Sequence, residues 1–171
     1  MHDEAKAYIG EDSPELAMAE PGGANVSVRE GNSGDRGEWL RMRTMLFPDC
    51  PSEQNEREMD ACLASDSDAI FVAQRTSGGL CGFVEASVRP WAVNCEAMPV
   101  GYLESWYVDA DSRRQGIGRA LVHAAECWAR SKGCRQMASD AELLNITSQQ
   151  AHVRLGYEET MRLVLYKKDL V

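Results

Sequence analysis

The stretch that decides the fold is Val108-Asp-Ala-Asp-Ser-Arg113-Arg114-Gln115-Gly116-Ile117-Gly118-Arg119-Ala-Leu121. It joins the end of an apolar, strand-like segment to a short basic turn, and two glycines then open an amphipathic helix. Glycines there let the backbone approach a ligand closely, and the free N–H groups of a helix start attract negative charge. Three arginines in the same stretch add full positive charges. The stretch therefore predicts a binding site for a pyrophosphate.

Two other phosphate-binding motifs do not fit this spacing. A nucleotide P-loop has Gly-x-x-x-x-Gly-Lys-Ser/Thr, whereas here one residue separates the glycines and no Lys-Ser/Thr pair follows. The Rossmann fingerprint needs a third glycine or an alanine where this chain has Leu121, and no strand–helix–strand unit opens the chain. The spacing excludes both motifs.

Working outward from this stretch, alternating and helical apolar patterns divide the rest of the chain into elements. We predict strands at residues 26–30, 69–75, 80–89, 100–108, 136–139 and 160–167, and helices at residues 33–46, 53–63, 116–131 and 146–155. This order favours an α/β (α+β) fold, in which helices cover a mixed central sheet. Residues 1–24 show no sustained periodicity and are expected to form a loosely ordered extension. Residues 25–171 are expected to form a single domain.

Length, charge and composition limit the function. The chain has 171 residues, fits one domain and carries a net charge of −9 at pH 7, which argues against a nucleic-acid binder. It has no apolar run long enough for a membrane helix and no apolar run near Met1 of the kind that a secretory signal needs, so we expect a cytoplasmic protein. Six cysteines without paired close spacing do not make a zinc site, so we expect reduced thiols and no metal.

The charges are unevenly distributed. Residues 113–135 contain six basic residues and one acidic residue, whereas residues 47–111 contain twelve acidic and three basic residues. One interpretation is a solvated helix with chance clustering of charge. The other is a local anion site beside a separate acidic surface that suits a cationic partner.

The pattern Arg113-x-x-Gly116-x-Gly118 after a strand resembles the acetyl-CoA loop of the GNAT N-acetyltransferase superfamily. The order of elements from about Val26 to Leu170 is similar to that fold as well. The resemblance implies helices on both faces of the sheet and a V-shaped splay of parallel strands that holds acetyl-CoA. The residues that it implies for acetyl-CoA binding lie on a bulged strand, in the loop and in a later turn: Trp106, Tyr107, Val108, Arg113, Arg114, Gln115, Gly116, Ile117, Gly118, Arg119 and Asn145.

Five further stretches resemble the aminoglycoside 6′-N-acetyltransferases of bacterial resistance. They are Arg43-x-x-Leu-Phe47-Pro, Leu103-Glu104-Ser-Trp-Tyr-Val, Gly133-Cys-Arg-Gln-Met-Ala-Ser-Asp140, Asn145-x-x-Ser-Gln149 and Leu155-Gly-Tyr-Glu-Glu-Thr160. This resemblance implies an acetyl-CoA-dependent enzyme that acetylates the 6′-amine of a cationic aminoglycoside by direct transfer in a ternary complex. It implies neither a nucleic-acid nor a membrane partner, and it suggests a homodimer. Acetylation of polyamines or protein amines, and a catalytically silent CoA-binding module, remain the alternatives.

Two carboxylates carry the expected chemistry. Alkyl amines are mostly protonated at pH 7, so transfer to an amine needs a base. By the same resemblance, Glu104 and Asp140 contact the acceptor amines. We assign the base, acting through water, to one of them and the ammonium anchor to the other; either order fits the sequence, and we favour Glu104 as the base because it adjoins the bulge. The alternatives are a solvent-facing strand residue for Glu104 and a helix cap for Asp140.

Four other positions carry expectations of their own. Phe47 matches an aromatic position near the acceptor sugar, or it is ordinary core at a helix end, and Trp91 is expected to wall the acceptor cleft. His152 stands where many family members have a tyrosine that acts as general acid, so the resemblance leaves that role open. Finally, Gly118→Glu is expected to abolish acetyl-CoA binding and to leave the fold intact.

Overall fold

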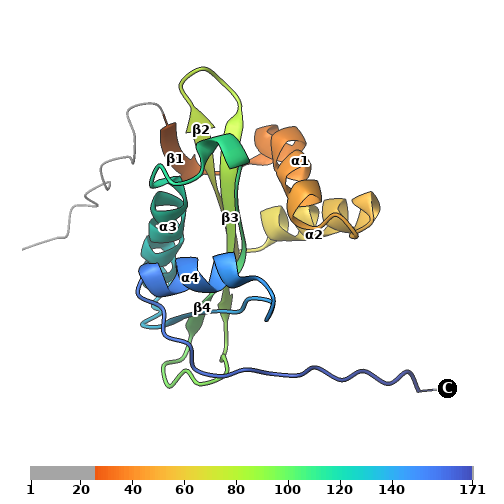
Figure 1. The fold of residues 1–171 in the computed structure, drawn as a ribbon, viewed down its shortest axis with the longest axis vertical. Helices are drawn as coiled ribbons and strands as arrows, with labels where there is room; N and C mark the ends of the chain where they lie inside the picture. The colour runs from red at the N-terminus through yellow and green to blue at the C-terminus, as the bar shows by residue number, and fades with distance from the viewer. Residues whose placement is uncertain (1–25, 171) are drawn as a thin grey trace, which may run out of the picture.

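The computed structural model describes residues 26–170, so the expected extension at 1–24 lies outside the described part of the chain. The centre of the molecule is a mixed five-stranded sheet in the order β1-β2-β3-β4-β5 (Figure 1). Its strands are β1 (Val26–Glu30), β2 (Asp68–Arg75), β3 (Leu80–Arg89), β4 (Val100–Val108) and β5 (Met137–Ser139). Neighbours from β1 to β4 are antiparallel, and β5 runs parallel to β4.

Helices cover both faces of this sheet, as the sequence predicts (Figure 1). The helical elements are η1 (Ser33–Asp35), α1 (Arg36–Leu46), α2 (Ser52–Ala64), η2 (Ala110–Ser112), α3 (Ile117–Ser131) and α4 (Ile146–Arg154). Helix α3 packs its apolar stripe, including Leu121 and Ala125, against one face, and Trp39, Met42 and Met59 of α1 and α2 pack against the other. Within residues 26–170, no helix is long and apolar enough to span a bilayer.

The expected bulge lies in β4 at Glu104. Glu85 of β3 pairs with Ser105 and Ala86 pairs with Leu103, so Glu104 is the extra residue between them. Strand β5 pairs with β4 only from Gly101 to Leu103. The two parallel strands therefore separate next to the bulge, and this is the V-shaped splay that the resemblance implies.

The predicted strand at residues 160–167 is wrong for the single chain. Residues 158–170 follow α4 without regular structure and run away from the rest of the domain (Figure 1). An extended segment becomes a strand only when a neighbouring strand pairs its backbone, and none of the described strands lies beside this one. Its apolar side chains are therefore exposed, Leu165 by 90% and Tyr166 by 92%.

Candidate active site

The start of α3 forms a cradle of backbone donors. Gly116 has a φ of +83°, a left-handed conformation that glycine adopts without strain, and it begins the helix. The first helical hydrogen bond in this turn runs from Ala120 N to Gly116 O at 3.0 Å. The N–H groups of the three residues between them therefore have no helical acceptor, and no acidic side chain lies in the first turn.

Three exposed arginines surround this helix start. Arg113, Arg114 and Arg119 form no ion pair with any residue in the described part of the chain, although the protein is strongly acidic overall. Arg113 is oriented by a hydrogen bond from its Nε to Val108 O at 2.9 Å, and Gln115 Nε2 donates to Asp111 O at 3.1 Å. Unpaired guanidinium groups beside free N–H donors give a site for a phosphate or pyrophosphate.

Gly118 has a different role from the one expected. A Cβ on Gly118 would lie 2.6 Å from Cζ2 of Trp106, so a side chain at this position would collide with the indole of β4. The expectation that Gly118→Glu leaves the fold intact is therefore wrong. Gly118 lets α3 pack closely on β4, whereas the arginines, which project outward, are the better positions for testing anion binding.

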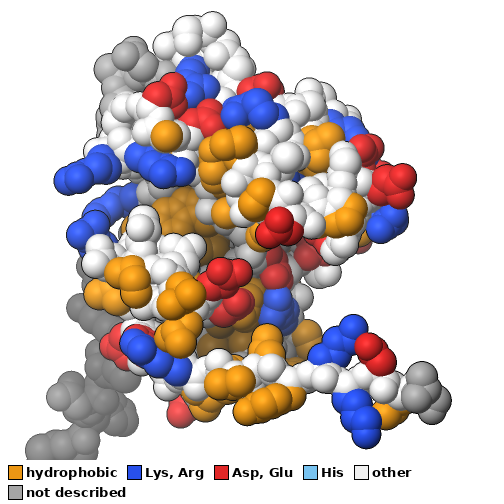
Figure 2. Space-filling model, turned by 45° about the vertical axis from the view of Figure 1, so that its right-hand side comes forward, with side chains coloured by type: hydrophobic (Ala, Val, Ile, Leu, Met, Phe, Trp, Pro, Cys, Tyr) orange, Lys and Arg blue, Asp and Glu red, His pale blue; other side chains and the backbone are white. Residues whose placement is uncertain are grey.

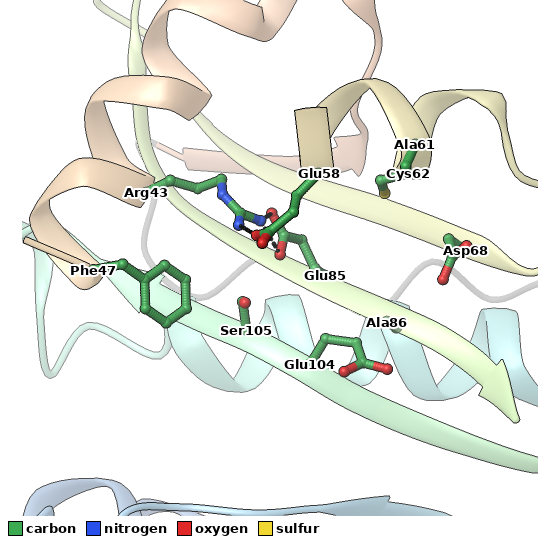
Figure 3. A pocket seen from close by; sticks show the side chains of 10 residues that line it. All are labelled: Arg43, Phe47, Glu58, Ala61, Cys62, Asp68, Glu85, Ala86, Glu104 and Ser105. Carbon is green, nitrogen blue, oxygen red and sulfur yellow. Dashed lines mark hydrogen bonds and ion pairs between the residues drawn. The ribbon is translucent and has the colours of Figure 1, made fainter. Parts of the chain in front are cut away.

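A cavity of about 310 Å³ opens on the other face of the sheet, between α1, α2, β2, β3 and β4 (Figure 3). Its lining residues are Arg43, Phe47, Glu58, Ala61, Cys62, Asp68, Glu85, Ala86, Glu104 and Ser105. Four of these residues carry carboxylates and only one carries a positive charge. The cavity is therefore acidic. All of its lining residues except Arg43 belong to the acidic stretch of residues 47–111. Burial raises the pKa of the Cys62 thiol to about 12, so this thiol is not a nucleophile at neutral pH.

Sequence reasoning missed the buried ion pair at the back of this cavity. Arg43 Nη1 donates to both oxygens of Glu85 at 2.6 and 2.7 Å, and Trp39 Nε1 donates to Glu85 at 2.7 Å. Arg43 also bonds Glu58 (Figure 3). Its Nε donates to Asn55 Oδ1 at 3.0 Å. These bonds compensate two charges that are almost completely buried. A lone glutamate within the apolar run of β3 was the available signal for such a pair.

Glu104 is exposed, and its carboxylate points away from the Arg43 pair (Figure 3). It forms an ion pair with Arg89 at 2.6 Å, and the guanidinium carbon of Arg89 lies 3.3 Å from the ring centroid of Tyr102. Tyr102 donates its hydroxyl to Asp140 Oδ1 at 2.6 Å. Asp140 does not line the cavity, but this chain of contacts connects it with Glu104.

The remaining candidate residues are placed as follows. Phe47 lines the acidic cavity below Arg43, whereas Trp91 is exposed on the loop after β3 and does not line it. Asn145 caps α4, since its Oδ1 accepts from Ser148 N at 3.0 Å. His152 lies with its Nε2 2.9 Å from Ser139 Oγ, at the end of β5 where the splay begins. Its Nδ1 lies 2.8 Å from Ser148 O.

The sequence also matches the profile of a known protein family. The sequence profile described as Acetyltransferase (GNAT) family matches residues 38–157. The chain belongs to the GNAT acetyltransferase family.

This GNAT chain is similar in sequence and structure to several aminoglycoside acetyltransferases. An aminoglycoside N(6')-acetyltransferase type 1 from Klebsiella aerogenes is 39% identical over 146 residues, which are 84% of this chain and 96% of that protein. The structure of AAC(6')-Iy in complex with the bisubstrate analogue CoA-S-monomethyl-acetylneamine aligns with a TM-score of 0.80 and 35% identity, covering 85% of this chain and 99% of that one. AAC(6')-Ih from Acinetobacter baumannii aligns with a TM-score of 0.79 and 32% identity over 85% and 99% of the two chains.

The residues present fit the diphosphate and arm of CoA. The free N–H groups and arginines at the start of α3 suit the diphosphate. The indole Nε1 of Trp106 is buried and has no hydrogen-bond acceptor among the described residues. It lies beside Gly118, between the cradle and the parted strands. A buried donor without an acceptor is costly, so this one suits a carbonyl of a bound ligand.

Proposed function

We propose that this protein transfers the acetyl group of acetyl-CoA directly to the 6′-amine of an aminoglycoside in a ternary complex. The observation that carries the proposal is the position of Glu104. Its bulge in β4 lies between the cationic cradle at the start of α3 and the acidic cavity on the α1 and α2 face. An anionic donor and a cationic acceptor can thus approach one strand from two sides. The names of the relatives and the CoA-analogue complex of AAC(6')-Iy support the same donor and acceptor.

The residues around the bulge supply what acetyl transfer to an amine needs. The acceptor arrives as an ammonium, and Glu104, directly or through water, takes a proton from it. The neutral nitrogen then bonds to the thioester carbonyl carbon, the carbon–sulfur bond breaks, and the sulfur leaves with the electron pair. The nitrogen gives up its second proton to become the amide, and the sulfur takes up one proton to become the thiol. Backbone donors of the bulge polarise the carbonyl oxygen. Asp140 anchors a second ammonium group.

The cavity favours an acceptor with several positive charges. Glu85 is committed to Arg43, but Asp68 forms no ion pair with any described residue and lies apart from the Arg43 cluster (Figure 3). Asp68 thus offers the cavity a negative charge that is unpaired among the described residues, and Glu104 offers its Oε2 beside its ion pair with Arg89. Asp140 is connected to Glu104 through Tyr102 and Arg89. Phe47 provides an apolar wall that suits the face of a sugar ring.

A thiol-release assay tests this function. The protein is incubated with acetyl-CoA and, separately, with aminoglycosides, polyamines and lysine-containing peptides. We expect rapid release of CoA thiol with aminoglycosides and much slower release with the other two classes. Turnover with polyamines or peptides alone would show that the acceptor is not an aminoglycoside. CoA binding without any turnover would indicate a catalytically silent CoA-binding module.

The cysteines bear on the cellular compartment of the protein. All six cysteines are free thiols in the structure, which suits a reducing compartment. We therefore propose a cytoplasmic enzyme that confers aminoglycoside resistance.

We also propose a homodimer, in which the C-terminal segment of residues 158–170 pairs with a second copy. Figure 2 shows this segment projecting from the body of the molecule with hydrophobic side chains on its surface. Met161, Leu163, Val164, Leu165 and Tyr166 are all at least half exposed in the single chain. An exposed apolar segment with strand-like sequence is costly in water unless a partner covers it.

Substitution of this segment tests the dimer. Leu165→Glu with Tyr166→Glu adds charge where the single chain is already exposed, so the domain itself should keep its stability. We expect wild-type protein to sediment as a dimer at about 10 μM and the double variant to sediment as a monomer, as expected for loss of an apolar interface. A monomeric wild type, or a variant that remains dimeric, would contradict the assembly.

A further inference from the structure

The carboxylate of Glu104 is held from one side by two side chains of β3. Arg89 donates to Oε1 from Nε at 3.0 Å and from Nη2 at 2.8 Å, and Nη2 also donates to Oε2 at 2.6 Å. Ser87 Oγ makes a further short hydrogen bond to Oε1. Oε1 thus accepts three hydrogen bonds, whereas Oε2 accepts one. A carboxylate oxygen has two lone pairs, so Oε2 is the atom that can still accept a proton-bearing group.

Arg89 is itself held in place. Its guanidinium stacks on Tyr102, 3.3 Å from the ring centroid, which is a favourable cation–π position. Tyr102 is fixed in turn by its hydrogen bond to Asp140. Burial and this hydrogen bond raise the pKa of Tyr102 to about 12, so the phenol remains a donor at neutral pH. The series Asp140–Tyr102–Arg89–Glu104 therefore connects both candidate carboxylates through fixed groups.

We propose that Arg89 is a positioning residue for acetyl transfer: it fixes Glu104 through Oε1 and leaves Oε2 for the incoming amine. This inference rests on the proposed function, because it requires an amine acceptor at Glu104. A planar guanidinium fork suits the role, since it matches the plane of a carboxylate and fixes its orientation. A base needs a third group that orients it, and Arg89 donates three of the four hydrogen bonds that this carboxylate accepts, with Ser87 donating the fourth.

Steady-state kinetics of Arg89→Gln test the inference. We expect kcat for the aminoglycoside to fall by about 10-fold or more, because small misplacements of a reacting group are costly. The aminoglycoside KM should change by less than about 3-fold, since the base acts mainly in the transition state. In a Glu104→Gln background the same substitution should cost less than about 3-fold, because the group that Arg89 orients is already lost. The affinity for acetyl-CoA, measured by calorimetry, should remain that of the wild type.

Arg130→Gln is the matched control, because it removes an arginine that pairs with Glu126 on the surface of α3. It should leave both kinetic parameters unchanged. A lower KM with unchanged kcat in Arg89→Gln would mean that Arg89 only competes with the substrate ammonium, and it would overturn the inference. If Arg89→Gln lowers kcat by the same factor in the wild type and in the Glu104→Gln background, the inference is overturned as well. A wild type without aminoglycoside turnover would remove the proposed function as well, whereas an active wild type with a fully active Arg89→Gln removes this inference alone.

Discussion

Glu104→Gln is expected to lower kcat for aminoglycoside acetylation on the order of 10²-fold, because it removes the proposed base and keeps the shape of the side chain. The loss should shrink between about pH 6 and 9, as a growing fraction of the amine deprotonates without help. Ser87 and Arg89 donate to Oε1, and the glutamine amide oxygen can still accept these bonds, so the fold should be kept. Steady-state kinetics across this pH range make the measurement.

Two further variants sharpen this test. Asp140→Asn keeps an oxygen for Tyr102 and should mainly raise the aminoglycoside KM, by about 1.5–3 kcal/mol for one charge-assisted contact. Glu53→Gln removes a carboxylate that is exposed on α2 and should change neither parameter. If Glu104→Gln and Asp140→Asn both keep wild-type kcat and KM from pH 6 to 9, the proposed active site is wrong.

Charge reversal in the cradle is expected to weaken acetyl-CoA binding by at least about 10²-fold. The double variant Arg114→Glu with Arg119→Glu replaces two charge-assisted phosphate contacts, each of about 1.5–3 kcal/mol, by repulsion. Neither side chain forms an ion pair with a described residue, so little native structure is lost. A glutamate at 119 also lies in the first turn of α3, where negative charge stabilises a helix.

Calorimetric titration with acetyl-CoA, together with thermal unfolding, separates binding from folding in this double variant. We expect unfolding at a temperature close to that of the wild type and a greatly raised Kd. Arg57→Glu, on the exposed side of α2, is the control for net charge and should bind normally. Wild-type affinity in the double variant would mean that the start of α3 does not hold the diphosphate.

The features that depend on local sequence could be predicted. The cradle combines two glycines and three arginines within seven residues, and the structure places them at the start of one helix. The bulge near Glu104 and the parting of the parallel strands are implied by the GNAT resemblance, and the structure contains both. Gly118 shows the limit of such reasoning, because its packing on Trp106 depends on a strand that the motif itself does not describe.

The features that depend on contacts between distant segments could not be predicted. The acidic cavity combines α1, α2, β2, β3 and β4, and no spacing in the sequence indicates that Glu58 and Asp68 line it with Glu104. Arg89 could not be predicted either. It is the last residue of β3, and only its contacts with Glu104 and Tyr102 in the structure suggest a role for it. The C-terminal segment has a strand-like pattern, but pairing depends on a partner strand that the single chain does not provide.

The position of the transferred acetyl group tests the central claim most directly. Two kanamycin-type substrates that differ only in a 6′-amine or a 6′-hydroxyl are incubated with acetyl-CoA and the enzyme, and the products are fragmented by mass spectrometry. The account predicts one acetyl group on the 6′-nitrogen of the first substrate and no acetylation at the 6′ position of the second. Equal turnover of both substrates, with the acetyl group on another amine, would contradict it.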